Sequence, residues 1–213
     1  MKNVMIVEDQ KMIRTILEGY IHKAEDFRLE ASIEGAEQAY ELCEMKDIHL
    51  ILMDVRTAYR ENGILAAAKI KKDFPSIKII VVTSLVDSDI LEKAKEAGAD
   101  GLWYKDADEG ALMDVIFRVM EGERVFPDAP PVVEIGTAKS VEFTKAELRV
   151  LRYLVKGLPY AKIAENLNME VVTVKYHVTN MLQKTNLKNK LQLAVAVSDA
   201  KFVVDLAGEE EEQ

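Results

Sequence analysis

Several strand-like runs in the first half of the chain end in polar residues that could handle a phosphoryl group. They comprise two adjacent carboxylates, a third carboxylate, a hydroxyl and an amine: Glu8, Asp9, Asp54, Thr83 and Lys105. Clustered carboxylates repel one another unless a hard cation such as Mg²⁺, which prefers oxygen ligands, neutralises them. A lysine and a hydroxyl beside that cation could hold a transferred phosphoryl group. The residue types therefore predict Mg²⁺-dependent phosphoryl chemistry, provided that the fold brings them together.

The strands and helices expected in residues 1–122 would bring these polar residues together. β-branched runs predict strands at Val4–Val7, Arg28–Ser32, Leu50–Asp54, Lys78–Thr83 and Gly101–Tyr104. Amphipathic stretches between and after them predict helices at Lys11–His22, Ala36–Met45, Ile64–Asp73, Ser88–Ala97 and Asp108–Glu121. This alternation indicates a parallel sheet covered by helices on both faces. In the strand order 2-1-3-4-5, the carboxyl ends of the strands and their polar residues converge on one pocket.

The composition of the 213-residue chain is that of a globular protein without a membrane span. Hydrophobic residues make up 49% and charged residues 31% of the chain, which excludes a disordered protein. No apolar run reaches the roughly 18 residues that a membrane helix needs. Cys43 is the single cysteine and cannot form an internal disulfide, and the N-terminus lacks a signal-peptide pattern. We therefore expect a cytoplasmic protein with no membrane partner.

The net charge of −9 is the sum of segments that differ in sign. Residues 1–122 carry 16 Lys and Arg against 24 Asp and Glu, and residues 123–142 carry 2 against 4. Residues 143–207 carry 10 against 5, and the tail, residues 208–213, contains four glutamates. Because DNA phosphates attract clustered Lys and Arg, only the third segment suits DNA binding. The expected organisation is an acidic domain, a linker, a basic domain and an acidic tail.

The basic segment is predicted to be helical throughout. Prolines and a glycine in residues 123–142 interrupt both the helical and the strand periodicity, which predicts a linker. Thr144 and Glu147 then form a capping box that starts a helix. Further helices are expected at about Ala161–Asn168, Val171–Lys184 and Lys190–Leu206. We predict an all-α, four-helix domain of the helix-turn-helix type, in which the third helix would enter the major groove of DNA.

The helix expected at Val171–Lys184 has one face that is suited to DNA. Its core-facing stripe is formed by apolar residues: Val174, Val178, Met181 and Leu182. The outward face and its borders carry hydrogen-bonding and cationic groups, among them Lys175, Tyr176, Thr179, Asn180 and Lys184. Such groups bind phosphates and base edges. By itself, this pattern is also typical of an ordinary solvated helix face.

The segments around the polar cluster resemble the receiver domain of two-component response regulators. The resemblance is carried by Val4–Asp9, Leu52–Asp54, Val81–Ser84 and Ala97–Gly101, followed by Lys105. It implies a flavodoxin-like fold in which Asp54 accepts a phosphoryl group from a histidine kinase. The implied Mg²⁺ ligands are Glu8, Asp9, Asp54 and the backbone carbonyl of Arg56, and the implied phosphoryl contacts are Thr83 and Lys105.

The basic segment resembles the LuxR-type output domain. The resemblance is carried by Phe143–Leu151, Gly157, Ile163–Ala164, Leu167 and Thr173–Lys184. It implies that Lys175, Tyr176 and Thr179 read bases, and that Asn180, Lys184 and Lys188 contact the DNA backbone. Together the two domains resemble the NarL/FixJ subfamily of response regulators. The implied function is phosphorylation-controlled binding to promoter DNA, with RNA polymerase as a further candidate partner.

The last expected helix carries a stripe that could pair two copies of the chain. Leu191, Ala194, Val195, Ser198 and Phe202 recur at helical spacing. A homodimer formed through this stripe would read two half-sites separated by about one helical turn of DNA or a multiple of it. We therefore expect the active protein to bind DNA as a homodimer.

Two alternatives arise from residues near Asp54. This chain lacks the proline that usually follows the acceptor in the family, places Gly63 one position later, and has Leu102 where the family usually has a switch aromatic. A regulator that binds DNA independently of phosphorylation is therefore the nearer alternative. The other is a Mg²⁺-dependent phosphotransferase or phosphatase with Asp54 as nucleophile, although Arg56 stands where such an enzyme needs a second acid. Beyond its own phosphorylation and dephosphorylation, we expect no enzymatic activity.

Overall fold

The computed structural model describes residues 1–86, 88–105 and 109–202, and the chain divides into two compact units. The first unit covers most of the chain up to Ala129, and the second consists of the described chain from Pro130 onward together with a short segment at Leu85 and Val86. Among the described residues, no helix is both long enough and apolar enough to cross a membrane. The sequence also predicts a capping box of Asp106 and Glu109, and these two side chains lie outside the described part of the chain.

The first unit is built on a parallel sheet of five strands. The strands are β1 (Lys2–Val7), β2 (Phe27–Ile33), β3 (Leu50–Asp54), β4 (Lys78–Thr83) and β5 (Gly101–Tyr104). Their order is β2-β1-β3-β4-β5 and every pair is parallel, which confirms the predicted topology. All five residues of β3 are buried, as expected of a central strand with helices on both sides.

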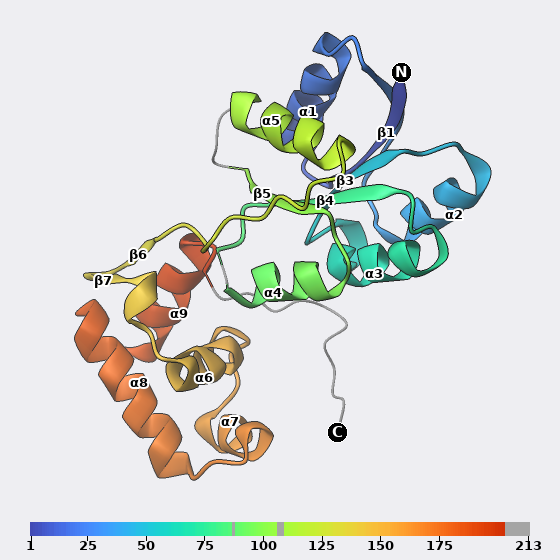
Figure 1. Cartoon of the computed structure of the whole chain (residues 1–213). Helices are drawn as coiled ribbons and strands as arrows, with labels where there is room; N and C mark the ends of the chain where they lie inside the picture. The colour runs from blue at the N-terminus through green and yellow to red at the C-terminus, as the bar shows by residue number, and fades with distance from the viewer. Residues whose placement is uncertain (87, 106–108, 203–213) are drawn as a thin grey trace. The chain divides into compact units, whose positions relative to one another are not determined.

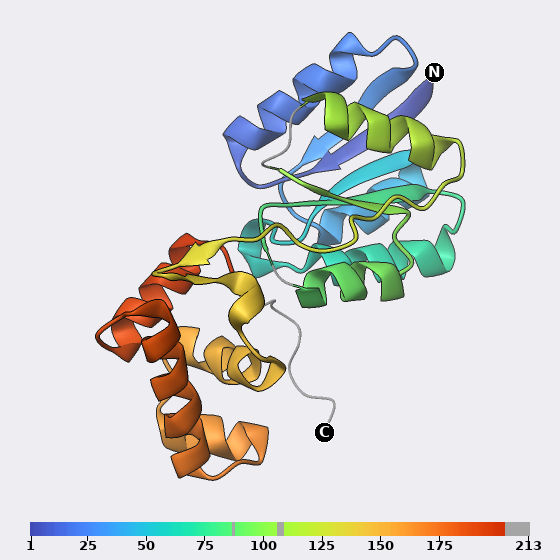
Figure 2. The ribbon, with the colours of Figure 1, turned by 60° about the vertical axis from the view of Figure 1, so that its left-hand side comes forward.

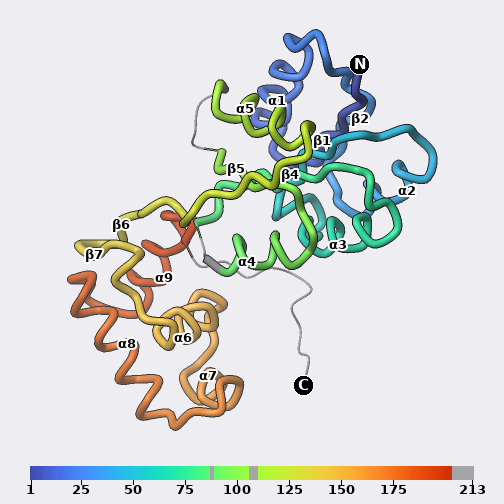
Figure 3. Tube along the Cα trace, viewed as in Figure 1, coloured from blue at the N-terminus to red at the C-terminus, as the bar shows by residue number. Residues whose placement is uncertain are grey.

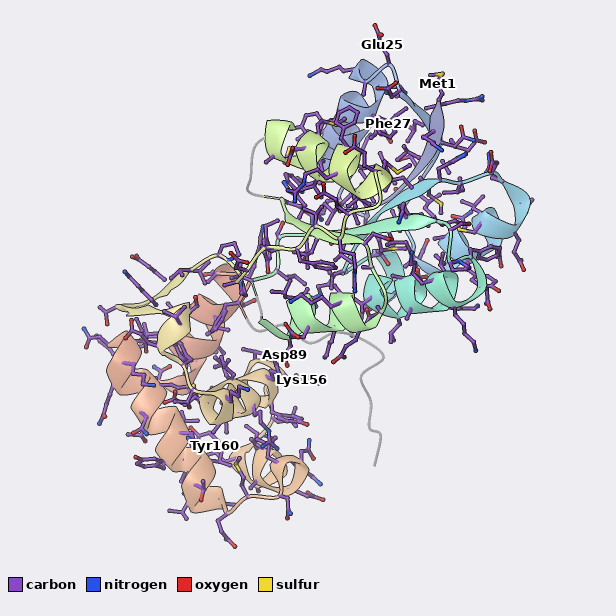
Figure 4. The ribbon with its side chains drawn as sticks, viewed as in Figure 1. Met1, Glu25, Phe27, Asp89, Lys156 and Tyr160 are labelled. Atoms are coloured by element: carbon purple, nitrogen blue, oxygen red, sulfur yellow. The ribbon has the colours of Figure 1, made fainter. Side chains whose placement is uncertain are left out.

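Helices cover both faces of this sheet (Figures 1 and 2). They are α1 (Lys11–Lys23), α2 (Glu37–Met45), α3 (Gly63–Asp73), α4 (Ser88–Glu96) and α5 (Glu109–Met120). Residues of α1 and α5 form one apolar core with the sheet, and residues of α2 and α3 form another on the opposite face. At the edge of the first core, the ring of Phe27, labelled in Figure 4, lies 5.5 Å from that of Phe117. The carboxyl ends of all five strands stay at one edge of the sheet, because the strands are parallel.

In its described residues, the second unit contains four helices and a short hairpin. The helices are α6 (Lys145–Val155), α7 (Tyr160–Leu167), α8 (Val171–Thr185) and α9 (Lys190–Asp199). The predicted capping box starts α6, because Thr144 Oγ1 accepts from the Glu147 amide at 3.2 Å and Glu147 accepts from the Thr144 amide at 2.7 Å. Tyr160, the first residue of α7, lies under the ammonium group of Lys190 at 4.9 Å (Figure 4). The four helices confirm the predicted helical C-terminal unit.

The structure differs from the expected linker in residues 123–142. Two-residue strands β6 (Glu134–Ile135) and β7 (Ala138–Lys139) pair antiparallel, and the 3₁₀ turn η2 (Ser140–Glu142) follows them. Ile135 and Ala138 are buried in the apolar core of the helical unit. The second half of the predicted linker is therefore an integral part of the second unit.

The last helix is shorter than predicted. α9 ends at Asp199 rather than near Leu206, and the residues beyond Phe202 lie outside the described part of the chain. Phe202 is only 5% exposed, and its ring packs 5.7 Å from that of Phe143. Because Phe202 is not helical and belongs to the core, its predicted place in the exposed pairing stripe was wrong.

Candidate phosphoryl and DNA-binding sites

Three carboxylates gather at the carboxyl edge of the sheet. Glu8 and Asp9 follow β1, and Asp54 ends the neighbouring strand β3. One carboxylate oxygen from each residue lies within 4.8 Å of the others. Glu8 is fully buried and Asp54 is 4% exposed, whereas Asp9 is exposed. The strand-end position alone places these groups together, as the sequence predicted.

Lys105 joins this carboxylate cluster from the residue after β5. Its Nζ lies 2.5 Å from Oε2 of Glu8 and 2.8 Å from Oδ2 of Asp54. The side chain of Lys105 is only 4% exposed, so water screens these two ion pairs weakly. Lys105 is also fixed through its backbone, because its amide donates to the Thr83 carbonyl at 2.9 Å. The ammonium group is thus held beside the oxygen atoms of Asp54.

The electrostatics of the cluster match a bound divalent cation. Burial raises the pKa of Asp54 to about 7, with Lys105 opposing and Glu8 reinforcing the rise. Three carboxylates face one ammonium group, so negative charge is in excess. The donor atoms are all hard carboxylate oxygens, which suit Mg²⁺. A divalent cation held by Glu8, Asp9 and Asp54 would balance this charge and favour the ionised form of Asp54.

Two of the other predicted site residues have clear places in the fold. Thr83 is fully buried and ends β4, the strand that pairs with β3. Arg56 follows β3 with an exposed side chain, and its backbone pairs with that of Asn62 in an isolated antiparallel β-bridge.

The residue at the position of the switch aromatic, Leu102, is buried in β5 and only 2% exposed. Tyr104 lies two residues further along the same strand, pairs with Thr83 and is 8% exposed. The aromatic ring nearest in sequence to Lys105 is therefore buried on the same strand face as Leu102.

The loop after Asp54 is held by contacts that sequence reasoning missed. Thr57 is buried, and its hydroxyl accepts from the Ala36 amide at 3.1 Å, while Glu61 Oε2 accepts from the Glu37 amide at 2.9 Å. Tyr59 and Arg60 both adopt left-handed backbone conformations, with φ of 60° and 62°. Such angles are strained for residues other than glycine and persist where surrounding contacts fix the backbone. The loop that differs from the family pattern is thus anchored to the start of α2.

The backbone of Gly63 lies directly against the backbone of Asp54, although Gly63 is one position later than the family glycine. A Cβ atom at Gly63 would lie 1.9 Å from the Asp54 carbonyl oxygen. Its amide donates to the carbonyl of Val55 at 3.0 Å. The extra loop residue is therefore accommodated before Gly63, and α3 still starts directly against the end of β3.

Arg14 is a further residue of this site that the sequence did not indicate. Its Nη1 donates to the carbonyl oxygen of Glu8 at 2.7 Å, and its Nη2 lies 2.8 Å from Oε1 of Glu34. The guanidinium group therefore ties α1 and the end of β2 to the residue that carries the buried carboxylate. No sequence periodicity marks Arg14, because one of its contacts is with a backbone atom and the other is with a side chain 20 positions away.

The outward face of α8 is polar and cationic in the structure. Val174, Val178, Met181 and Thr185 are buried, and Leu182 is partly buried, so Thr185 extends the predicted core stripe. Tyr176 is 62% exposed, and the side chains of Lys175 and Thr179 are exposed beside it. Asn180 is half-buried at the border, and Lys188 is exposed just beyond the helix. The side chains of these five predicted DNA contacts therefore reach the surface of this unit.

Lys184, the sixth predicted DNA contact, is partly exposed and also forms contacts within the unit. Its Nζ lies 2.7 Å from Glu147 Oε2 and 2.8 Å from the carbonyl oxygen of Glu142. The Glu147 side chain is 3% exposed, and that of Lys184 is 30% exposed. Burial would raise the pKa of Glu147, but hydrogen bonds from Lys184 and Thr144 outweigh it and hold that pKa below its usual value. Lys184 thus links the last turn of α8 to the start of α6.

The predicted pairing stripe of α9 faces outward. Leu191 is 71% and Val195 is 52% exposed. Ser198 is also exposed and Ala194 is half-buried, while Leu193 and Val197 point into the core. An apolar surface of this kind is available to a second copy of the chain.

The structure combines an α/β unit that carries a carboxylate cluster at the end of its sheet with a helical unit of the helix-turn-helix type. The family described as "Response regulator receiver domain" matches residues 4–117, and that described as "Bacterial regulatory proteins, luxR family" matches residues 141–197. The chain belongs to the two-component transcriptional response regulators that combine these two domains.

Individual relatives extend along nearly the whole chain. The nitrate/nitrite response regulator protein NarL of Escherichia coli is 30% identical over 203 residues, covering 91% of this chain and 94% of NarL. Response regulator protein VraR of Staphylococcus epidermidis is 29% identical, covering 90% of this chain and 94% of VraR. A solved structure of two RcsB dimers bound to two parallel DNAs shares the fold, with a TM-score of 0.61 at 21% identity, covering 92% of this chain and 98% of that one.

Proposed function

We propose that this protein binds promoter DNA in the cytoplasm under the control of phosphorylation at Asp54. The observation that carries the proposal is the placement of the Asp54 carboxylate, which is buried between Lys105 and two further acids. A histidine kinase would supply the phosphoryl group. A carboxylate oxygen of Asp54 forms a bond to phosphorus as the bond from phosphorus to the donor nitrogen breaks.

The residues around Asp54 have two roles in this transfer: some would contact the phosphoryl group and others would hold Mg²⁺. Lys105 lies close enough to Asp54 to offset negative charge on the phosphoryl oxygens, and Thr83 ends the adjacent strand, where its hydroxyl suits an oxygen of the same group. Glu8, Asp9, Asp54 and the carbonyl of Arg56 would hold Mg²⁺. When bound, Mg²⁺ supplies positive charge that screens the approaching phosphoryl group from the carboxylates.

DNA recognition is assigned to the outward face of α8. Lys175, Tyr176 and Thr179 would contact bases, and Asn180, Lys184 and Lys188 would contact the backbone. A homodimer formed through Leu191, Ala194, Val195 and Ser198 of α9 would present two copies of α8 to the DNA. RNA polymerase is the partner that such a DNA-bound dimer would recruit or block at a promoter.

The test compares wild type with Asp54→Asn, each with Mg²⁺ and with or without an acyl phosphate as a small phosphodonor. Duplex DNA is first selected by the wild-type protein from a random pool, and binding is followed by fluorescence anisotropy. We expect the donor to add one phosphoryl group to the wild type by mass spectrometry and to tighten its DNA binding, with neither change in Asp54→Asn. Asp47→Asn, at a side chain that is 82% exposed, is the matched control.

The phosphorylation-independent alternative predicts a different result in the same experiment. It is favoured by the strained loop after Asp54 and by Leu102 at the switch position. Equal and donor-insensitive DNA binding by wild type and Asp54→Asn would support it and would remove the phosphorylation-dependent step. Catalytic turnover of an added phosphomonoester would instead indicate a phosphatase.

A further inference from the structure

The hairpin β6–β7 contacts the C-terminal end of α8, the helix assigned to DNA recognition. The backbone trace turns at residues 136–137, next to the last turn of α8 (Figure 3). The amide of Thr137 donates to the Thr185 carbonyl at 3.1 Å, and the Thr137 hydroxyl donates to the Lys184 carbonyl at 3.0 Å. One residue of the hairpin therefore binds two carbonyl groups at the end of α8.

These two bonds complete the hydrogen bonding of the helix end. The last four carbonyl groups of an α-helix lack partners within the helix. In α8, the carbonyl of Leu182 accepts from the Leu187 amide at 3.2 Å, and that of Gln183 accepts from the Asn186 amide at 3.4 Å. The chain after α8 thus satisfies the first two carbonyls, and Thr137 satisfies the last two.

Gly136 permits this close approach. It has φ of +60°, and a Cβ atom there would lie 2.2 Å from the Thr185 carbonyl oxygen. The hairpin is itself fixed, because Ile135 and Ala138 on either side of the turn are 0% and 1% exposed in the core. The contact is therefore between a rigid turn and the backbone of α8.

We propose that Gly136 and Thr137 are positioning residues for DNA recognition, which fix the orientation of α8 without contacting DNA. This inference rests on the proposed function of α8. The 15 residues of α8 span about 22 Å, so a tilt of about 10° at its C-terminal end displaces the other end by about 4 Å. A displacement of this size breaks hydrogen bonds to base edges, because they need donor–acceptor distances within a few tenths of an ångström. Binding to phosphates through charge tolerates them better, because it is less directional.

The test measures the ratio of affinities for a selected duplex and an unrelated duplex at the same salt concentration. The selected duplex is obtained from a random pool with wild-type full-length protein. We expect Gly136→Ala and Thr137→Val to lower this ratio by about tenfold, comparable to losing one or two hydrogen bonds, while binding to the unrelated duplex stays within about twofold. Thr137→Ser keeps the hydroxyl, so this variant should have the same affinity ratio as the wild type.

Gly157→Ala is the matched control for the glycine substitution. Gly157 lies in the same unit with φ of +79°, but apart from its own chain neighbours no atom lies within 4 Å of its Cβ position. It therefore carries the backbone strain of an alanine at positive φ without the contact to α8, and its affinity ratio should equal that of the wild type. Thermal unfolding by circular dichroism shows which variants remain folded.

Folded Gly136→Ala and Thr137→Val variants with the wild-type ratio would overturn the inference. A parallel loss of binding to both duplexes in Thr137→Val would also overturn it, because it would indicate general destabilisation. Tyr176→Ala distinguishes this failure from a failure of the proposed function. If Tyr176→Ala also kept the wild-type ratio, α8 would not read the bases, and the proposed function itself would be wrong.

Discussion

Gly63 is the residue whose substitution should most directly disturb the end of β3. An alanine there would place Cβ 1.9 Å from the carbonyl oxygen of Asp54, so either α3 or the acceptor residue must move. We expect Gly63→Ala to destabilise the receiver unit by about 3 kcal/mol, a typical cost of severe overpacking, and to slow phosphorylation of Asp54. Urea unfolding and phosphorylation by an acyl phosphate measure the two effects.

Gly19→Ala provides the opposite expectation for the same substitution. Gly19 lies within α1, and apart from the backbone of this helix and its chain neighbours no atom lies within 4 Å of its Cβ position. Because alanine is the better helix former, Gly19→Ala should stabilise the unit by about 1 kcal/mol. Equal stability changes for the two variants would contradict the assignment of Gly63 to a backbone contact.

The ion pair of Glu147 and Lys184 makes a pH-dependent contribution to the helical unit. The pKa of Glu147 lies below its ordinary value, so the pair stabilises the fold fully above about pH 4.5 and loses this effect as pH falls through the folded-state pKa. We expect Glu147→Gln to lower stability by about 2 kcal/mol at neutral pH, because it leaves the Lys184 ammonium without its buried partner.

Thermal unfolding over a pH series tests this expectation. The difference between wild type and Glu147→Gln should be largest near neutral pH and should shrink below about pH 4.5. The control is Glu165→Gln, which removes the exposed pair with Lys162 (65% and 62% exposed) and should cost less than about 0.5 kcal/mol. A constant difference between wild type and Glu147→Gln across this range would show that the charge of Glu147 does not stabilise the unit.

At the scale of elements, the dimer surface on α9 depends on an exposed apolar stripe. Leu191 is 71% exposed, so a glutamate is tolerated in the monomer but would be buried, unpaired, in an α9–α9 interface. We expect Leu191→Glu to weaken binding to a two-half-site duplex by about tenfold or more, since burying an unpaired charge costs several kcal/mol. Analytical ultracentrifugation with DNA reports the oligomeric state.

Val141→Glu is the control for this substitution, because Val141 is equally exposed at 71% and lies outside α9. It should leave both dimerisation and affinity unchanged. A dimer on DNA with unchanged affinity in Leu191→Glu would place the interface elsewhere.

The long elements were predictable from sequence, and the short ones were not. Buried strands such as Leu50–Asp54 are apolar except at the last residue, and the rule that ligands bind at strand ends located the carboxylates and Lys105. The strands Glu134–Ile135 and Ala138–Lys139 have only two residues each, too few to show an alternating pattern. The sequence pattern therefore predicts a linker over residues 134–142, although these residues belong to the second unit.

The unpredicted site contacts share one physical reason. Arg14 binds a carbonyl oxygen, Thr57 accepts from a backbone amide, and Thr137 binds two carbonyls of α8. Such contacts depend on where the backbone passes, and side-chain periodicity does not record this. The pairing of Glu147 with Lys184 also joins residues 37 positions apart, beyond any local pattern.

At the scale of the whole molecule, the distribution of charge leads to a hypothesis about regulation. Residues 1–122 carry 24 acidic against 16 basic residues, whereas residues 130–207 carry 11 basic against 7 acidic ones. The acidic unit repels DNA phosphates and so lowers the affinity of the whole chain, independently of any direct contact between the units. Phosphorylation would then need to overcome this repulsion through dimerisation.

This hypothesis predicts that the isolated fragment 130–213 binds a half-site duplex more tightly than the unphosphorylated whole chain. The fragment starts at Pro130 because the hairpin belongs to the helical core, and a half-site is used so that dimerisation does not contribute. The advantage should shrink as salt rises from 50 to about 200 mM, since added salt screens the charges of residues 1–122. Fragment 130–207, which lacks the four tail glutamates, should bind more tightly still. Equal or weaker binding by both fragments at every salt concentration would show that the acidic segments do not oppose DNA binding, and control would then have to reside in dimerisation alone.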